Sequence, residues 1–166
     1  MTSPSFDPIR ILDVLNRHGV EYVVIGGIAA MLQGSPTNTY DLDVCYKRDK
    51  KNINALVEAL RELGARLRGF PPELRFELDA KAFLLGDTMT FETTFGDFDC
   101  LGNPSGTTGF ADLARSARPQ DLADGVRVSV CSLDDLIRMK KAASRPKDLR
   151  EVAILEMLKQ VTEGRA

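Results

Sequence analysis

Apolar residues along this chain alternate between two spacings, and the changes of spacing divide it into helices and strands. After Asp7-Pro8, apolar side chains recur at helical spacing as far as His18, and Asp followed by Pro is typical of a helix start. Ser132-Leu133-Asp134-Asp135 resembles a capping box and opens a later helix. The helical spacing predicts helices over residues 8–18, 28–32, 52–63, 110–114, 132–141 and 148–161.

Short apolar runs and alternating runs predict the strands between these helices. Phe95-Gly96 separates two such runs and is typical of a hairpin turn. Residues 69–87 mix charged and apolar positions around two consecutive prolines, and we assign no element there. The strands are predicted over residues 22–25, 41–46, 65–67, 89–93, 97–101 and 126–131.

These elements follow one another without a linker or an internal repeat. A chain of 166 residues can form one domain with a substantial core. We therefore predict a single domain over residues 1–166 of the α/β (α+β) class, with a small mixed sheet flanked by helices. Its core would span about 20–131, and a C-terminal helical pair would follow over about 132–161.

Composition excludes several other classes of protein. Hydrophobic residues make up 43% of the chain and charged residues 28%, as in ordinary globular proteins, and no apolar run approaches the roughly 20 residues of a membrane helix. The N-terminal residues lack the basic and apolar blocks of a signal peptide, so we expect a cytoplasmic protein without a membrane partner. The three cysteines have no metal-ligand spacing and are predicted to be reduced, buried thiols. The single histidine, His18, lies at a predicted helix end and does not indicate a Ser-His-Asp catalytic triad.

Charge is unevenly distributed, although the net charge is only −2. Such a balance gives no overall basic surface for nucleic acid. Between residues 138 and 150, however, six basic residues accompany one acid, Asp148, which either begins a helix or belongs to a site. This basic strip could bind a triphosphate or an RNA end, or simply form a solvated helix surface. Its members are Arg138, Lys140, Lys141, Arg145, Lys147 and Arg150.

Two carboxylates stand on one face of the predicted strand at 41–46. Side chains two apart on a strand point the same way, so Asp41 and Asp43 lie side by side while the residues between them face the core. Such a pair is costly unless a cation or solvent compensates the charge, and Mg²⁺ prefers hard oxygen ligands. A third acid follows in the strand at 97–101, where Asp97 and Asp99 share a face. We favour Asp99, because Phe98 and Cys100 flank it whereas Asp97 adjoins the turn.

A pair of glycines precedes this strand. Gly26 and Gly27 follow the predicted strand at 22–25 and open the helix at 28–32. Without side chains, their backbone N–H groups can approach a phosphate at the helix N-terminus. The stretch has neither the G-x-G-x-x-G spacing of dinucleotide sites nor a P-loop. Together with the acids, the glycine turn indicates a phosphate-rich ligand beside a divalent metal.

The glycine turn followed by Thr39-Tyr40-Asp41-Leu42-Asp43 resembles the signature of the DNA polymerase β-like nucleotidyltransferase superfamily. More narrowly, the chain is similar to the small bacterial nucleotidyltransferases of the AbiEii and MenT toxin type. The stretch 94–101 resembles the strand that carries their third acid, and residues 132–140 and 145–148 resemble their C-terminal helices. The chain has Gly27 where some relatives have a serine, and Thr37-Asn38-Thr39 where many relatives have Arg-x-Thr.

The resemblance implies the nucleotidyltransferase fold and a role for each matching residue. Asp41 and Asp43 would bind Mg²⁺, or Mn²⁺ in its place, and Asp99 would be the third ligand or the base that activates the acceptor. Lys140 would contact nucleotide phosphates and count with the three acids as catalytic. The remaining nucleotide-binding residues would be Gly26, Gly27, Thr39, Arg145 and Lys147.

The function that the resemblance implies is Mg²⁺-dependent transfer of a nucleoside monophosphate from a nucleoside triphosphate (NTP) to a hydroxyl acceptor. The acceptor would be a tRNA 3′ end or a partner protein, and the chain would be the toxin of a toxin–antitoxin pair with a cognate antitoxin as partner. Two alternatives stay open. One is a catalytically degenerate module that binds a nucleotide or a partner, and the other is an antibiotic-type adenylyltransferase acting on a small molecule.

Overall fold

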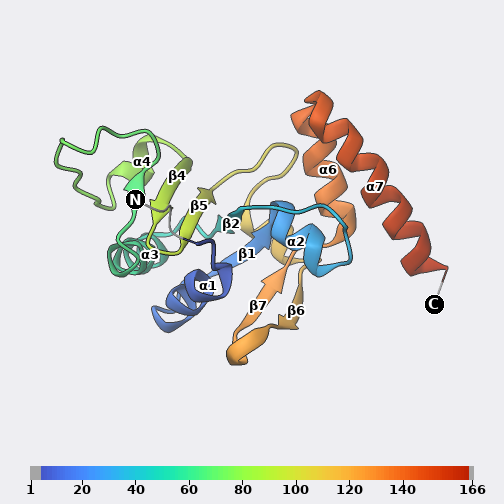
Figure 1. The fold of residues 1–166 in the computed structure, drawn as a ribbon, viewed down its shortest axis with the longest axis horizontal. Coiled ribbons are helices and arrows are strands. Elements are labelled where there is room, and N and C mark those ends of the chain that lie inside the picture. The colour runs from blue at the N-terminus through green and yellow to red at the C-terminus, as the bar shows by residue number, and fades with distance from the viewer. Residues whose placement is uncertain (1–4, 165–166) are drawn as a thin grey trace.

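Seven strands form one mixed sheet with helices around it in the computed structural model, which describes residues 5–164 (Figure 1). The strands lie in the order β3-β4-β5-β2-β1-β7-β6. They are β1 (Tyr22–Ile25), β2 (Asp41–Tyr46), β3 (Arg66–Leu67), β4 (Thr88–Thr93), β5 (Gly96–Leu101), β6 (Arg118–Asp121) and β7 (Arg127–Val130). The helices are α1 (Pro8–Arg17), α2 (Gly26–Leu32), α3 (Lys50–Glu62), α4 (Ala82–Leu85), α5 (Phe110–Ala114), α6 (Leu133–Ala143) and α7 (Pro146–Glu163), with a short 3₁₀ turn at Ala123–Gly125.

Side-chain caps begin three of the longer helices. Asp7 accepts a hydrogen bond from the backbone N–H of Arg10 before α1, and Asp49 accepts one from Asn52 before α3. Ser132 accepts one from the N–H of Asp135 before α6, as its capping-box pattern predicts. In Figure 1, α1 and α3 lie together on one side, whereas α6 and α7 form a helical pair at the opposite end of the molecule.

The register at the centre of the sheet decides where the polar side chains gather. β2 runs antiparallel to β1 and parallel to β5, so that Asp43 lies opposite Ile25 on one side and Asp99 on the other. Leu42 and Val44 alternate with the acids and are fully buried. The centre of the sheet thus has an apolar face in the core and a face that carries carboxylates.

The predicted fold class is confirmed, and the structure adds elements that the apolar pattern did not indicate. β6 is an edge strand of the sequence Arg-Pro-Gln-Asp, which has no apolar alternation, and α4 is a single turn inside the unassigned stretch 69–87. α2 begins two residues earlier than predicted, at Gly26, and α7 begins at Pro146. The exact residue at which a helix begins depends on local backbone contacts, which the spacing of apolar residues does not reveal.

The three cysteines are buried and free, as predicted. None of the described helices is long and apolar enough to cross a membrane. Buried apolar residues from α1 to α7 belong to one cluster. We therefore propose that residues 1–166 form one domain, in which the helices over about 132–161 pack on the core over about 20–131.

Candidate functional site

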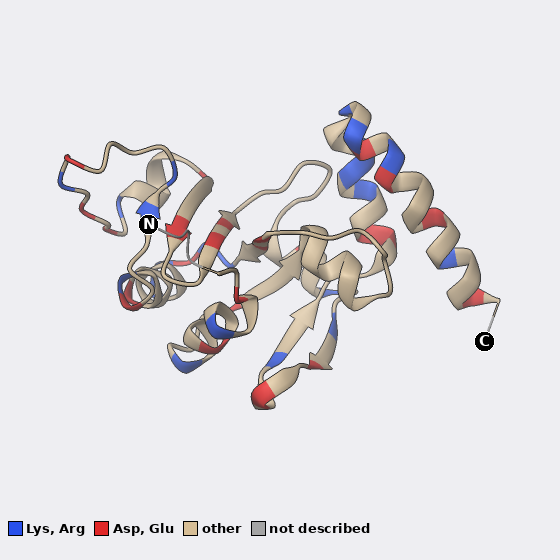
Figure 2. Ribbon diagram, in the orientation of Figure 1, with Lys and Arg blue, Asp and Glu red and all other residues tan. Residues whose placement is uncertain are grey.

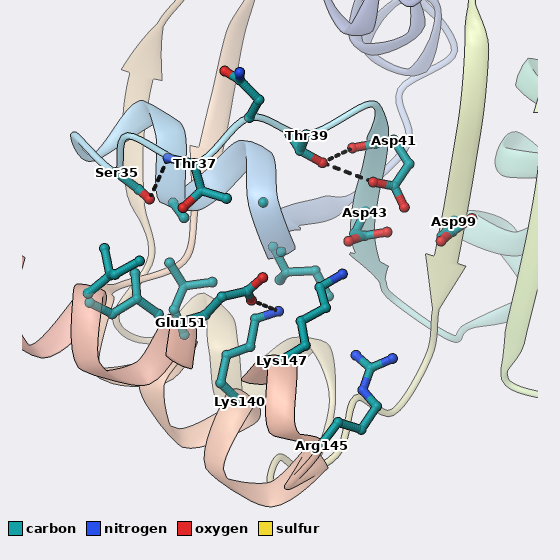
Figure 3. A pocket seen from close by; sticks show the side chains of 18 of the residues that line it. Ser35, Thr37, Thr39, Asp41, Asp43, Asp99, Lys140, Arg145, Lys147 and Glu151 are labelled. Carbon is teal, nitrogen blue, oxygen red and sulfur yellow. Dashed lines mark hydrogen bonds and ion pairs between the residues drawn. The ribbon is translucent and has the colours of Figure 1, made fainter. Parts of the chain in front are cut away.

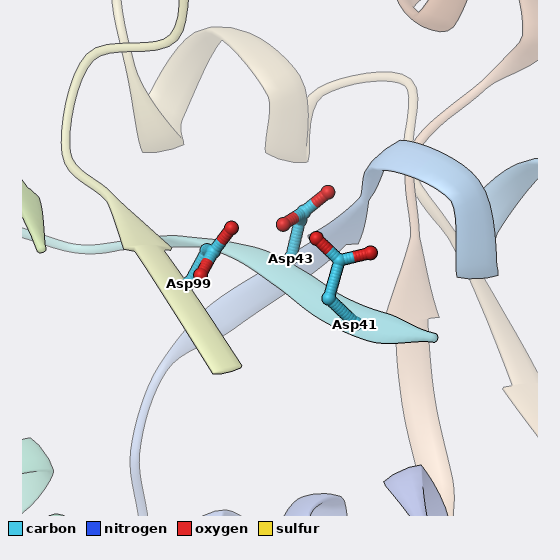
Figure 4. A group of neighbouring side chains, drawn as sticks. All are labelled: Asp41, Asp43 and Asp99. Carbon is cyan, nitrogen blue, oxygen red and sulfur yellow. The ribbon is translucent and has the colours of Figure 1, made fainter. Parts of the chain in front are cut away.

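Three carboxylates meet at the centre of the sheet. Asp41 and Asp43 project from β2, and Asp99 projects from β5 toward them (Figure 4). Each can offer one oxygen atom such that the three oxygens lie within 4.8 Å of one another. The parallel register that pairs Asp43 with Asp99 produces this geometry, so the cluster follows directly from strand alternation.

The cluster is electrostatically unfavourable without a cation. Burial, together with the neighbouring charges of Asp41 and Asp99, raises the pKa of Asp43 to about 8. Burial also raises the pKa of Asp99, although the guanidinium of Arg68 opposes this shift. Clustered hard oxygen donors of this kind suit a divalent cation. The three acids therefore fit a divalent metal, as the sequence analysis expected of them.

Asp97 shares the face of Asp99 but lies outside the cluster. It pairs in register with Asp41, and its side chain is 45% exposed against 15% for Asp99. Of the two acids that competed for the third position, the structure brings Asp99 to the other carboxylates. Its role as metal ligand or base stays a prediction.

Arg68 reaches the cluster and was not among the predicted residues. Its Nη2 donates a hydrogen bond to Oδ1 of Asp99 at 2.7 Å, and its Nε lies 3.5 Å from Oδ2 of Asp97. The residue directly follows the two-residue strand β3, where its own N–H bonds to the carbonyl of Thr90 at 2.9 Å. A strand of two residues has too little alternation to indicate which of its neighbours face the acids, so this arginine was not predicted.

The glycine turn passes directly beside the acids. Gly26 has a φ of +67°, and a Cβ atom at this position would collide with the carboxylate of Asp43. A Cβ atom on Gly27 would lie 2.8 Å from the side chain of Thr39. Both glycines are therefore required by close approach, and Gly26 is required by its backbone conformation as well.

Thr39 holds one of the acids in place. Its hydroxyl donates a hydrogen bond to Oδ1 of Asp41 at 2.9 Å from the loop that connects α2 to β2 (Figure 3). Ser35 and Thr37 lie on the same loop and line the same cavity. Thr39 thus touches a predicted metal ligand and lines the same cavity.

Opposite the acids, α6 and α7 contribute three cations that are held to different degrees (Figure 3). Nζ of Lys140 lies 2.5 Å from Glu151 and 3.4 Å from the buried Asp148. The Nε of Arg145 donates to Asp148 at 2.7 Å. Lys147 is exposed, points into the cavity, and takes part in none of the ion pairs among residues 5–164.

Asp148 both begins a helix and orders the cations. Its carboxylate is fully buried and accepts a hydrogen bond from the backbone N–H of Arg145 at 3.2 Å, which completes a capping box. The guanidinium of Arg145 lowers the pKa of this carboxylate to about 2. Of the two alternatives for Asp148, the helix start is therefore observed, while a place in the site stays a prediction; the same group that caps α7 pairs with Lys140 and Arg145. Glu151 had no sequence signal beyond ordinary helix composition.

The remaining basic strip is largely compensated by acids. Arg138 forms a bidentate pair with Asp112 and also bonds to Asp135, and Lys141 pairs with Glu156. Figure 2 shows blue and red positions interleaved along α6 and α7, and Asp112 lies on α5. The strip therefore presents less free positive charge than its composition suggests.

Acids and cations line a single cavity of about 430 Å³, a size typical of small-molecule sites. One wall of the cavity is acidic and the facing wall is basic. Apolar residues of α2, α6 and α7 complete the lining. Every predicted site residue lines this cavity, as does the missed Glu151. The apolar side is formed by Ala30, Leu136, Ile154 and Leu155.

One family model matches most of the chain, and solved structures share its fold. Residues 8–157 match the family model described as aminoglycoside-2″-adenylyltransferase. The lincosamide antibiotic adenylyltransferase LnuA, solved with lincomycin, resembles the chain with a TM-score of 0.62 at 12% identity, over 94% of this chain and 99% of that one. The antibiotic-resistance factor ANT(2″)-Ia resembles it with a TM-score of 0.56 at 18% identity, over 94% and 89%. A comparison with curated protein sequences finds no match.

A further structure of ANT(2″)-Ia, in complex with adenylyl-2″-tobramycin, resembles the chain with a TM-score of 0.54 at 17% identity, over 93% of this chain and 94% of that one. At these identities, the structural likeness concerns the fold. The match over residues 8–157 covers both the acids of the sheet and the cations of α6 and α7.

Proposed function

We propose that this chain, which belongs to the aminoglycoside-2″-adenylyltransferase family, transfers a nucleoside monophosphate from an NTP to a hydroxyl group of a small molecule. Its family makes it a nucleotidyltransferase, and the predicted superfamily is confirmed. The observation that carries the finer proposal is the cavity in which Asp41, Asp43 and Asp99 face Lys140, Arg145 and Lys147.

The proposed reaction is an in-line displacement at the α-phosphorus. The acceptor oxygen forms a bond to this phosphorus, while the bond from phosphorus to the bridging oxygen of pyrophosphate breaks and pyrophosphate leaves with the electron pair. The acceptor proton passes to the Asp99 carboxylate or to water. Asp41, Asp43 and Asp99 would hold a divalent cation, for which we propose Mg²⁺ or Mn²⁺, and which when bound neutralises phosphate charge.

The other residues of the cavity position the triphosphate. The glycine turn lets the phosphates approach the backbone N–H groups of α2, because no side chain occupies this space. Lys147 is the cation best placed to bind the phosphates, since it is exposed and points into the cavity. Arg145 and Lys140 add positive charge from fixed positions, because Asp148 and Glu151 hold them.

Several observations support a small acceptor over the tRNA or protein acceptor that the toxin resemblance implies. The cavity has the volume of a small-molecule site, and the basic strip that could have bound RNA is largely paired with acids. The similar structures of LnuA and ANT(2″)-Ia include an antibiotic or its adenylylated form. We therefore propose the antibiotic-type alternative, with ATP as donor. A tRNA or protein acceptor and an antitoxin partner stay as predictions that the same experiment tests.

The test is incubation of the chain with each α-labelled NTP and Mg²⁺ in the presence of tobramycin, lincomycin, total tRNA or cell extract. We expect label from ATP in a small molecule, lost in an Asp41→Asn/Asp43→Asn variant. Asp121→Asn, whose side chain is 75% exposed on β6, is the matched control and should retain transfer. Label in tRNA or protein would favour the toxin-type acceptor. Absence of label with every NTP in a folded protein would contradict the proposal.

A further inference from the structure

On one side the cavity extends from Asp99 to the start of β4. The cations of α6 and α7 occupy the end where the phosphates would bind, and Gly26 closes the β1 side of Asp43. On the other side of Asp99 the sheet continues into β4, where Thr88 is exposed and lines the same cavity. Thr90 pairs in register with Asp99, so β4 continues the polar face of β5 toward the edge of the sheet.

Arg68 sets the charge of this side of the cavity. Its guanidinium bonds to Asp99 at 2.7 Å and lies 3.5 Å from Asp97. The guanidinium is also fixed by the carbonyl of Phe91, which accepts from Nη2 at 3.1 Å, and so cannot swing away without losing this bond. Farther out, Arg66 lies opposite Glu92 in the register of β3 and β4. The guanidinium of Arg66, however, bonds to the carbonyls of Pro71 and Leu74. If Asp99 held a divalent cation, the guanidinium of Arg68 would therefore be left to face Asp97.

A polycationic acceptor needs uncompensated carboxylates, because like charges across an interface are costly. Beside the cavity, the exposed carboxylate of Asp97 already has the guanidinium of Arg68 next to it. We propose that Arg68 is a specificity-determining residue that selects a neutral or singly charged hydroxyl compound and disfavours a polyamine. This proposal rests on the proposed function, because it concerns the acceptor of the same reaction.

The test is calorimetric binding of tobramycin, which carries several amino groups, to the chain saturated with Mg²⁺ and a non-hydrolysable ATP analogue. We expect weak binding to the natural chain and about tenfold tighter binding to Arg68→Gln. Arg68→Lys keeps the charge and should bind within about twofold of the natural chain. Arg127→Gln makes the same change of charge at an exposed position on β7 and is the matched control.

A second variant tests the charge balance independently of Arg68. Thr88→Asp adds an acid at an exposed position of the same side and should also tighten tobramycin binding about tenfold, even if Arg68→Gln does not fold. Equal binding by the natural chain and both variants, or equal effects of Arg68→Gln and Arg127→Gln, would overturn the role of Arg68. Failure of the ATP analogue itself to bind the natural chain would overturn the proposed function and this inference together.

Discussion

The two walls of the cavity are built in different ways. On the acidic wall, strand register places Asp41, Asp43 and Asp99, and these groups repel one another. On the basic wall, buried or half-buried acids hold Lys140 and Arg145, and these contacts are attractive. The carboxylates of the acidic wall therefore lack compensating charge, whereas Lys140 and Arg145 on the basic wall are paired with acids before any ligand binds. Binding of a metal ion and a nucleotide should accordingly reduce the repulsion within the acidic wall more than it changes the contacts of the basic wall.

The largest expected effect comes from the acidic wall. Asp43→Asn removes the central carboxylate, so we expect Mn²⁺ binding to fall below detection and transfer to fall by on the order of 10³-fold. Electron paramagnetic resonance of free Mn²⁺ measures the first effect. Asp97→Asn, on the same face but outside the cluster, is the control. If both variants lose Mn²⁺ equally, the assignment of the cluster to Asp41, Asp43 and Asp99 is wrong.

A methyl group beside the same carboxylate should have the next largest effect. Gly26→Ala strains a backbone with a φ of +67° and pushes against Asp43, so we expect a loss of about 1–3 kcal/mol in unfolding free energy and about 10²-fold in transfer. Gly19→Ala has a similar φ of +71° but open space around it. The control should therefore lose stability and keep activity. Equal loss of activity in both variants would show that strain alone, and not the contact with Asp43, is responsible.

The basic wall should respond more weakly. Lys147→Ala removes the exposed cation that points into the cavity, and we expect KM for the NTP to rise about tenfold with little change in kcat. Lys51→Ala, on the exposed side of α3, is the matched control. Steady-state kinetics measures both constants. A fall in kcat without a change in KM would instead place Lys147 at the reacting atoms.

The smallest effect concerns pH. Arg145 holds the pKa of Asp148 at about 2, below its ordinary value of 3.8. A carboxylate with a lowered pKa in the folded state stabilises the fold above the unfolded value and loses this contribution as pH falls toward the folded one. We expect the difference in unfolding free energy between the natural chain and Asp148→Asn to be constant above about pH 5 and to shrink between pH 4 and 2. Urea unfolding across this range measures it, and a pH-independent difference would contradict the pairing.

Much of the acidic wall could be predicted from the sequence, and less of the basic wall. The alternation of Asp41 and Asp43 with buried residues fixes their face, and the choice of Asp99 over Asp97 rested on its apolar neighbours. Residues that reach the cavity from other parts of the fold show no comparable pattern in the sequence. Arg68 follows a two-residue strand, and Glu151 is one of several acids on α7, so only the folded chain brings them to the cavity.

The contact between Gly27 and Thr39 also constrains how this motif can evolve. A Cβ atom at position 27 would lie 2.8 Å from Cβ and from Oγ1 of Thr39. A serine at position 27 would therefore require the backbone around residue 39 to shift, and with it the hydroxyl that holds Asp41. The size of the residue at position 27 and the placement of the Asp41 carboxylate are therefore coupled through this one steric contact.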